Sequence, residues 1–121
     1  MSVNHTSRIT SATNFESDVI ELSHSQLVLV DFWADWCSPC KMLAPVLENL
    51  ASEFKDLITI FKVDTVAEPD LASRFNIRSL PTVKFFKNEK VIDEFMGALP
   101  ESEIKTLITN HLPNPADDDI L

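Results

Sequence analysis

The sequence predicts an α/β fold in which a central mixed β-sheet of about five strands is flanked by about four helices. Three observations carry this prediction. Apolar runs typical of buried strands alternate with segments of helical periodicity. A hairpin-like pair of strands follows them and adds antiparallel pairing to the sheet. The chain has 121 residues, of which 45% are hydrophobic, so it has the size and composition of one compact domain.

The first predicted elements are a short helix, a strand and a long helix. Asn14 to Leu22 opens on a capping residue and keeps apolar residues on one face, which predicts a helix. Leu27 to Ala34 is almost continuously apolar and predicts a strand buried on both faces. The long helix begins close to Cys37 and keeps its apolar spacing to Phe54. It contains Pro45, which should kink it by removing one backbone hydrogen bond.

The second half of the chain predicts a strand, a short helix, a hairpin and a final helix. Leu57 to Val63 is again a buried strand, and Pro69 to Phe75 is a short helix with its proline in the first turn, where a missing N–H costs little. The strands Thr82 to Phe86 and Val91 to Met96 are separated by four polar residues, a spacing typical of an antiparallel hairpin. A helix from Pro100 to His111 completes the fold, with acidic residues in its first turn.

We expect one domain over residues 10–112, with an N-terminal extension over residues 1–9. Residues 113–121 contain two prolines and three consecutive aspartates, so we expect a solvated acidic tail or the stub of a linker there.

The charge balance excludes two classes of function. The chain has 10 basic and 19 acidic residues, a formal net charge of −9 at pH 7. This charge repels phosphate backbones and anionic lipids, which argues against nucleic-acid and membrane-surface roles. No apolar run is long enough to span a bilayer, and the first ten residues are polar, so we expect a cytoplasmic protein.

Cys37 and Cys40 are the only two cysteines of the chain. At the start of a helix this spacing places both sulfurs about one turn apart on one face, close enough to bridge. Unpaired N–H groups and the helix dipole favour thiolate over thiol at the first position, so Cys37 is the predicted nucleophile. Cys40, one turn inside the helix, is suited to attack the resulting mixed disulfide.

The cysteines alone leave two other interpretations open. Half of a zinc site would need two further ligands, yet His5, His24 and His111 are isolated in sequence and no second cysteine pair exists. An inert structural disulfide would close a loop too short to constrain the unfolded chain much. We therefore expect a reversible Cys37–Cys40 disulfide, no metal and no bound cofactor.

The segment Val30 to Lys41, which reads VDFWADWCSPCK, and Pro45 after it resemble the active-site segment of the thioredoxin family. The stretch Phe75 to Thr82, the phrase Phe85 to Asn88 and the pair Gly97-Ala98 fall in the order and spacing of the same family. The resemblance covers almost all of the expected domain. It implies the thioredoxin fold and a protein thiol–disulfide oxidoreductase.

The resemblance also implies roles for residues around the dithiol. Burial of Asp31 in an apolar strand should raise its pKa by desolvation, and the resemblance makes it the acid that moves protons to and from Cys40, with Lys62 as its partner. Pro81 is implied to be a cis-proline opposite the dithiol. We interpret Trp33 as an ordinary packing aromatic. The apolar surface implied to dock partner proteins comprises Trp36, Leu80, Pro81, Met96 and Gly97.

Four positions around these motifs carry further expectations. Ser38 stands where bacterial thioredoxins most often have glycine, and we hypothesise that its hydroxyl favours the reduced form and makes the couple slightly more oxidising. Pro39 should stiffen the loop between the cysteines. Asn88-Glu89 replaces the common Asn-Gly and should weaken the hairpin turn. Gly97 is the only glycine, which suggests a position where a side chain would obstruct the backbone or the approach of a substrate.

The leading functional hypothesis is a monomeric, general protein-disulfide reductase that a flavoprotein thioredoxin reductase recharges with electrons from NADPH, and whose partners are disulfide-containing client proteins. One alternative is a co-chaperone, because Gly97 to Ile104 and His111 to Asp117 also resemble the thioredoxin domain of a bacterial co-chaperone that continues into tetratricopeptide repeats. Redox activity would then be secondary to holding clients. An inert binding scaffold is disfavoured by the dithiol, Asp31 and Pro81 together.

Overall fold

The computed structural model describes residues 7–113 of the chain. Residues 1–6, which make up most of the expected N-terminal extension, and residues 114–121 of the expected acidic tail lie outside the described part. Among the described helices, none combines the length and the apolar character that crossing a membrane requires.

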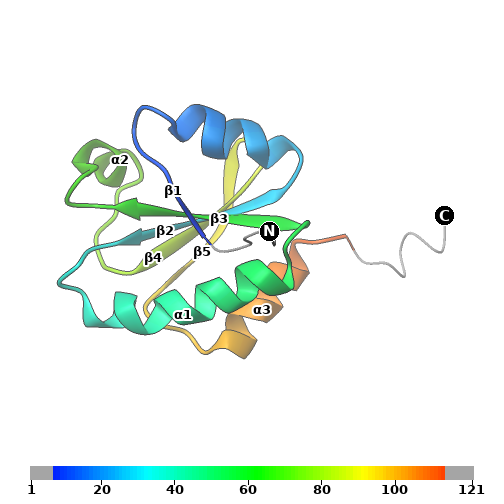
Figure 1. Ribbon diagram of the computed structural model, residues 1–121. Coiled ribbons are helices and arrows are strands. Elements are labelled where there is room, and N and C mark those ends of the chain that lie inside the picture. Colours follow the sequence, from blue (N-terminus) through cyan, green and yellow to red (C-terminus); the bar gives the residue numbers. More distant parts are fainter. Residues whose placement is uncertain (1–6, 114–121) are drawn as a thin grey trace, which may run out of the picture.

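A five-stranded mixed sheet forms the centre of the molecule, with the strand order β1-β3-β2-β4-β5 (Figure 1). β1 and β3 pair in parallel, as do β3 and β2, whereas β4 is antiparallel to both of its neighbours. The predicted fold class is therefore confirmed. The strands are β1 (Arg8–Ile9), β2 (Leu27–Trp33), β3 (Ile58–Asp64), β4 (Thr82–Lys87) and β5 (Lys90–Met96).

β1 is the one strand that the sequence pattern does not predict. Its two residues, Arg8 and Ile9, pair with Phe61 and Lys62 of β3. They fall inside the segment expected to be an extension, so the sheet begins before residue 10. Two residues are too few to show the alternation by which a strand is recognised.

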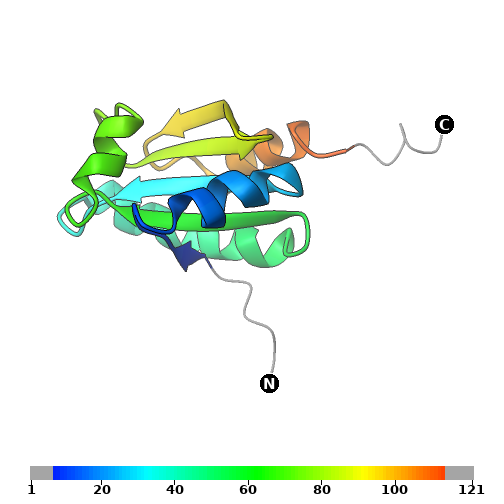
Figure 2. The same ribbon diagram turned by 90° about the horizontal axis from the view of Figure 1, so that it is seen from above.

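Helices cover both faces of the sheet (Figure 1). α1 (Ser38–Glu53) and α3 (Glu101–Asn110) lie on one face, and η1 (Glu16–Glu21), η2 (Leu22–His24) and α2 (Pro69–Arg74) lie on the other. Figure 2, seen from above, shows η1 and η2 running along the strands beneath them. The first helical segment lies where it was expected, but η1 is a π-helix followed by the 3₁₀ turn η2.

The alternation of side chains along β2 places the site residues on a particular face. Leu27 and Leu29 belong to the core cluster that contains the buried side chains of α1 and α3, while Val28 belongs to the cluster under η1 and α2. Because side chains on a strand alternate between faces, Asp31 and Trp33 continue the row of Leu27 and Leu29. Both therefore lie on the α1 side of the sheet.

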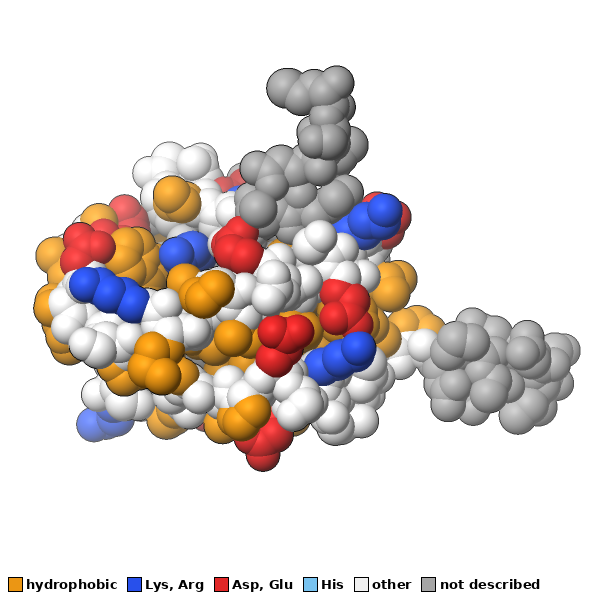
Figure 3. Space-filling model, turned by 60° about the horizontal axis from the view of Figure 1, so that its bottom comes forward, with side chains coloured by type: hydrophobic (Ala, Val, Ile, Leu, Met, Phe, Trp, Pro, Cys, Tyr) orange, Lys and Arg blue, Asp and Glu red, His pale blue; other side chains and the backbone are white. Residues whose placement is uncertain are grey.

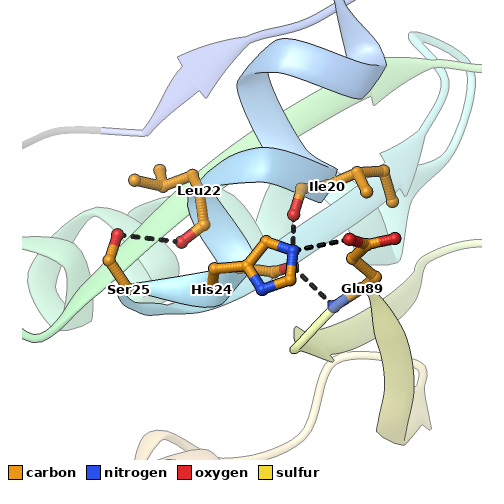
Figure 4. Close-up of polar contacts among 6 residues, drawn as sticks. Ile20, Leu22, His24, Ser25 and Glu89 are labelled. Atoms are coloured by element: carbon orange, nitrogen blue, oxygen red, sulfur yellow. Dashed lines mark hydrogen bonds and ion pairs between the residues drawn. The ribbon is translucent and has the colours of Figure 1, made fainter.

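The β4–β5 hairpin turns at Asn88 and Glu89, whose φ values are 51° and 71°. Positive φ at both central residues is the mark of a type I′ turn, so the predicted hairpin is confirmed. The tip rests on η2: the N–H of Asn88 donates to the carbonyl of Ser23 at 2.8 Å, and the N–H of Glu89 donates to Ser23 Oγ at 2.8 Å. His24 Nε2 lies 2.5 Å from the Glu89 carboxylate (Figure 4).

Candidate active site

The predicted site residues come together at the C-terminal end of β2. A three-residue turn leads from β2 to Cys37, the N-cap residue of α1. β4 begins at the same end, since Thr82 pairs with Phe32, and β5 ends there, since Met96 pairs with Thr82. One end of the sheet thus carries the dithiol, the Leu80-Pro81 peptide and the Met96-Gly97 pair.

Cys37 caps α1 with its own side chain. Its backbone is extended, with φ −91° and ψ 106°, and its Sγ accepts a hydrogen bond from the N–H of Cys40 at 3.2 Å. The sulfur therefore occupies the place of the oxygen in an ordinary N-cap and meets the donors that a helix start leaves unpaired. In the reduced protein, these donors and the helix dipole favour a thiolate at Cys37.

Cys37 and Cys40 form a disulfide, with their Cα atoms 5.3 Å apart. Each residue is only 4% exposed. Ser38 and Pro39, between them, are exposed, and Pro39 lies in the first turn of the helix, where it needs no hydrogen-bond partner. Among residues 7–113, no three His, Cys, Asp or Glu side chains gather as a set of metal ligands.

Asp31 is a buried acid behind the disulfide. It is 1% exposed, and its Oδ1 finds no hydrogen-bond donor among the described residues. Burial raises the pKa of this carboxyl from 3.8 to about 7, and the positive charge of Lys62 offsets part of that rise. The side chain is thus able to hold or release a proton near neutral pH.

A cavity of about 100 Å³ lies beside Asp31 and Cys40. Asp31 and Lys62 occupy the same register position of the parallel pair β2 and β3, so both side chains can reach it. The structure therefore brings together the dithiol, the acid and the lysine that the sequence pointed to. The cavity is lined by Asp31, Trp33, Asp35, Cys40, Lys41, Ala44 and Lys62.

Exposed apolar side chains border the dithiol. Trp36 is 73% exposed and Met96 is 54% exposed, which is unusual for side chains of this size. Met42, on the first turns of α1, is 67% exposed and was not among the expected docking residues. On the face shown in Figure 3, hydrophobic side chains gather at the left, the end of the molecule where α1 begins in Figure 1.

Leu80, Pro81 and Gly97 lie at the same end of the sheet. Together with Trp36 and Met96, we call these residues the apolar rim. The Leu80-Pro81 peptide bond is cis, as the resemblance implied. Pro81 is buried and Leu80 is half-buried. The N–H of Gly97 donates to the Pro81 carbonyl at 2.9 Å, which ties the end of β5 to the start of β4.

The space around Gly97 does not bear out the first expected reason for this glycine, obstruction of the backbone. A Cβ atom built on it would meet no atom within 4 Å, but its φ is +82°. Side chains other than glycine rarely adopt this left-handed conformation, so the backbone angle accounts for the glycine. The second expected reason, obstruction of an approaching substrate, stays a prediction.

Trp33 is the site residue that the sequence analysis assigned to ordinary packing. Its ring lies under the Lys62 ammonium, with Nζ 4.8 Å from the ring centroid, and it lines the cavity with Asp31. The signal was present in the sequence, because a spacing of two residues on a strand puts Trp33 and Asp31 on one face.

A scan against protein-family models matches residues 6–110 to the model described as Thioredoxin. The chain is 41% identical over 104 residues to Thioredoxin 1 of Synechococcus elongatus, an alignment that covers 86% of this chain and 94% of that protein. It is 41% identical over 103 residues to Thioredoxin C-2 of Corynebacterium nephridii, covering 85% and 94% of the two chains.

A chloroplast protein is also similar. The chain is 46% identical over 85 residues to the M-type thioredoxin of Spinacia oleracea, which covers 70% of this chain and 47% of that protein. These comparisons favour redox chemistry and do not favour the co-chaperone alternative.

Proposed function

The chain belongs to the thioredoxin family and is a thiol–disulfide oxidoreductase of the disulfide-reductase type, and we propose from this premise that it is a general reductase of protein disulfides. The observation that carries the proposal is the Cys37–Cys40 disulfide at the N-cap of α1, with a buried acid of raised pKa behind it. A structural clip would need neither the helix terminus nor the acid.

The first step uses the reduced protein. The Cys37 thiolate attacks one sulfur of a client disulfide, a new S–S bond forms between Cys37 and the client, and the client's other sulfur leaves as a thiolate. Donors at the start of α1 support this step because they lower the cost of holding negative charge on Cys37 Sγ.

The second step resolves the mixed disulfide. Asp31, in its ionised form, takes the proton of the Cys40 thiol, and the Cys40 thiolate attacks Cys37 Sγ. The Cys37–Cys40 disulfide forms and the client leaves with its second sulfur reduced. Two electrons pass from the dithiol to the client. Asp31 returns the Cys40 proton to the departing client thiolate, and the other client thiolate takes a proton from solvent, equal to the one that Cys37 released when it ionised.

The apolar rim gives clients a place to bind. Trp36 and Met96 are exposed beside a nearly buried disulfide, so a client segment that covers them comes within reach of Cys37. The backbone of Leu80 is available to pair with an extended client segment, a mode of recognition that depends little on sequence. This mode suits an enzyme with many clients.

The oxidised protein needs a source of electrons. We assign this role to a flavoprotein thioredoxin reductase that uses NADPH, and we place the protein in the cytoplasm as a monomer. Each turnover leaves a disulfide, and a compartment that keeps thiols reduced can restore the dithiol continuously.

The test is reduction of insulin disulfides with NADPH and a thioredoxin reductase, followed as NADPH consumption. Wild type should turn over, and Cys37→Ser should fall to the rate measured without the protein. Ser102→Ala, on the exposed side of α3, controls for a serine-sized change on the surface and should retain the wild-type rate. Full activity of Cys37→Ser would refute the proposal.

A further inference from the structure

The Lys62 ammonium lies over the face of an aromatic ring, and no carboxylate among the described residues lies within 4.0 Å of it. Its Nζ is 4.8 Å from the centroid of the Trp33 ring. Among the ion pairs of residues 7–113, none includes Lys62. The indole face is therefore the group that the structure places against this ammonium.

The strands account for this arrangement. Lys62 continues the row of Ile58 and Ile60 on β3, which faces α1, and Trp33 continues the corresponding row on β2. Asp31 and Lys62 are paired in register, and Trp33 lies two residues further along β2. All three side chains line the same cavity as Cys40.

The choice of tryptophan has a cost that a smaller aromatic ring would avoid. Trp33 Nε1 is buried and finds no hydrogen-bond acceptor among the described residues. Of the aromatic side chains, however, tryptophan attracts a cation to its face most strongly. The tryptophan at this position is therefore better explained by the cation that its ring face attracts than by a hydrogen bond from its N–H.

We propose that Trp33 is a positioning residue for the reaction: its indole face holds the Lys62 ammonium at the cavity that Asp31 and Cys40 share. A lysine has a long flexible stem, and without the ring it would gain freedom to move toward water. The proposal rests on the proposed role of Asp31, because Trp33 acts on the chemistry only through Lys62 and that carboxyl.

Other charged groups near Asp31 must be separated from this effect. Asp35 from the turn after β2 and Lys41 from α1 also line the cavity, alongside Cys40. The experiment therefore compares the same substitution with and without Lys62, and it uses the oxidised protein, in which neither cysteine titrates.

The test follows the Asp31 carboxyl by carbon NMR, with Asp31→Asn to identify its resonance. Trp33→Leu is made in the wild type and in Lys62→Met. Loss of the Trp33 ring changes the burial of Asp31 in both backgrounds. It releases the Lys62 ammonium only in the background that contains Lys62. The pKa of Asp31 should therefore shift upward by about 0.5 more in the wild-type background. Equal shifts in the two backgrounds would overturn the proposal.

Two further measurements keep the test decisive if Trp33→Leu does not fold. In the unmodified protein, the ring should move the resonances of the Lys62 methylene protons next to Nζ upfield of those of an unstructured lysine, and unshifted resonances would count against the contact. Trp33→Phe keeps an aromatic face, so the coupling to Lys62 should persist in part; its complete loss would contradict a role for the ring face.

This titration is independent of turnover. If insulin is not reduced, the proposed general reductase function is wrong, but the Trp33–Lys62 coupling can still be measured. If the coupling is absent but insulin is reduced, the positioning role of Trp33 alone is wrong.

Discussion

Asp31 and Lys62 lie directly across from each other in the parallel pair β2 and β3, and both face the cavity beside Cys40. Burial and the charge of Lys62 act in opposite directions on the pKa of Asp31, and the two effects differ in size. Burial of Asp31 outweighs the attraction of Lys62, so the pKa of Asp31 rises to about 7. The protonation state of this carboxyl therefore changes across the neutral range, with consequences for stability and for rate.

The stability of the oxidised protein should fall as the pH rises from 3.8 to about 7. Because the pKa of Asp31 is raised from 3.8 to about 7, the folded state holds a proton that the unfolded state has released at intermediate pH. The free energy of unfolding then decreases by up to about 1.4 kcal/mol per pH unit across that window. Asp31→Asn removes this dependence, so its advantage over wild type should grow by roughly 4 kcal/mol between about pH 4 and pH 8.

Urea unfolding of the two oxidised proteins at several pH values measures this difference. Comparing the two proteins cancels the titration of the other carboxylates. A difference in unfolding free energy that stays constant with pH would show that Asp31 titrates normally.

The same substitution should slow the resolution of the mixed disulfide. Asparagine cannot accept the Cys40 proton, so Asp31→Asn should reduce insulin at least about 10-fold more slowly near pH 7. The deficit should shrink at alkaline pH, where hydroxide from solvent can take the Cys40 proton in place of Asp31. A pH profile parallel to that of wild type would contradict the role of Asp31.

Removal of the second sulfur should trap the intermediate. In Cys40→Ser, Cys37 can still attack a client, but nothing resolves the product, so a covalent complex with one client per chain should accumulate. Mass spectrometry without reductant detects it, and dithiothreitol should release it. Cys37→Ser is the matched control and should form no such complex.

Relief of the left-handed backbone at the hairpin tip should stabilise the fold without affecting activity. Glu89 has φ 71°, which costs a residue with a side chain about 1 kcal/mol. Glu89→Gly removes that cost, but it also removes the contact with His24. Glu89→Ala removes the same contact and keeps the cost, so it is the reference.

The glycine variant should be more stable than the alanine variant by about 0.5 to 1 kcal/mol in urea unfolding. Both should reduce insulin at the wild-type rate, because the tip lies at the other end of the hairpin from Met96. An alanine variant as stable as the glycine variant would show that the turn is not strained.

The order and type of most elements could be predicted because they depend on local patterns. Leu27 to Trp33 is recognisable as a buried strand by its apolar run, and α1 by its helical spacing. β1 was not predicted because two residues are too few to show the alternation of a strand. The π-helical character of η1 escaped because it is a property of backbone hydrogen bonding that side-chain spacing does not encode.

The sequence pointed to residues that the structure brings together where a single residue type suggests the chemistry, and it missed the contact of Trp33 where a neighbouring side chain decides the role. The spacing of Cys37 and Cys40 indicates a dithiol, and an acid in an apolar strand, such as Asp31, indicates a buried carboxyl with a raised pKa. Trp33 looked like a core residue because its contact with Lys62, 29 residues further along the chain, depends on the register between β2 and β3, which a single sequence does not give. Gly97 was noticed, but its φ of +82° is a property of the folded backbone.

The contact between Ser23 and the hairpin tip also bears on how the protein folds. Ser23 and Glu89 are 66 residues apart in sequence, so a large loop must close before this hydrogen bond can form. The hydrogen bonds of this junction can offset the entropy cost of closing the loop only after both η2 and the hairpin have formed. We expect this junction to form late in folding. In the native protein, the amide hydrogens of Asn88 and Glu89 should exchange with solvent through one shared local opening.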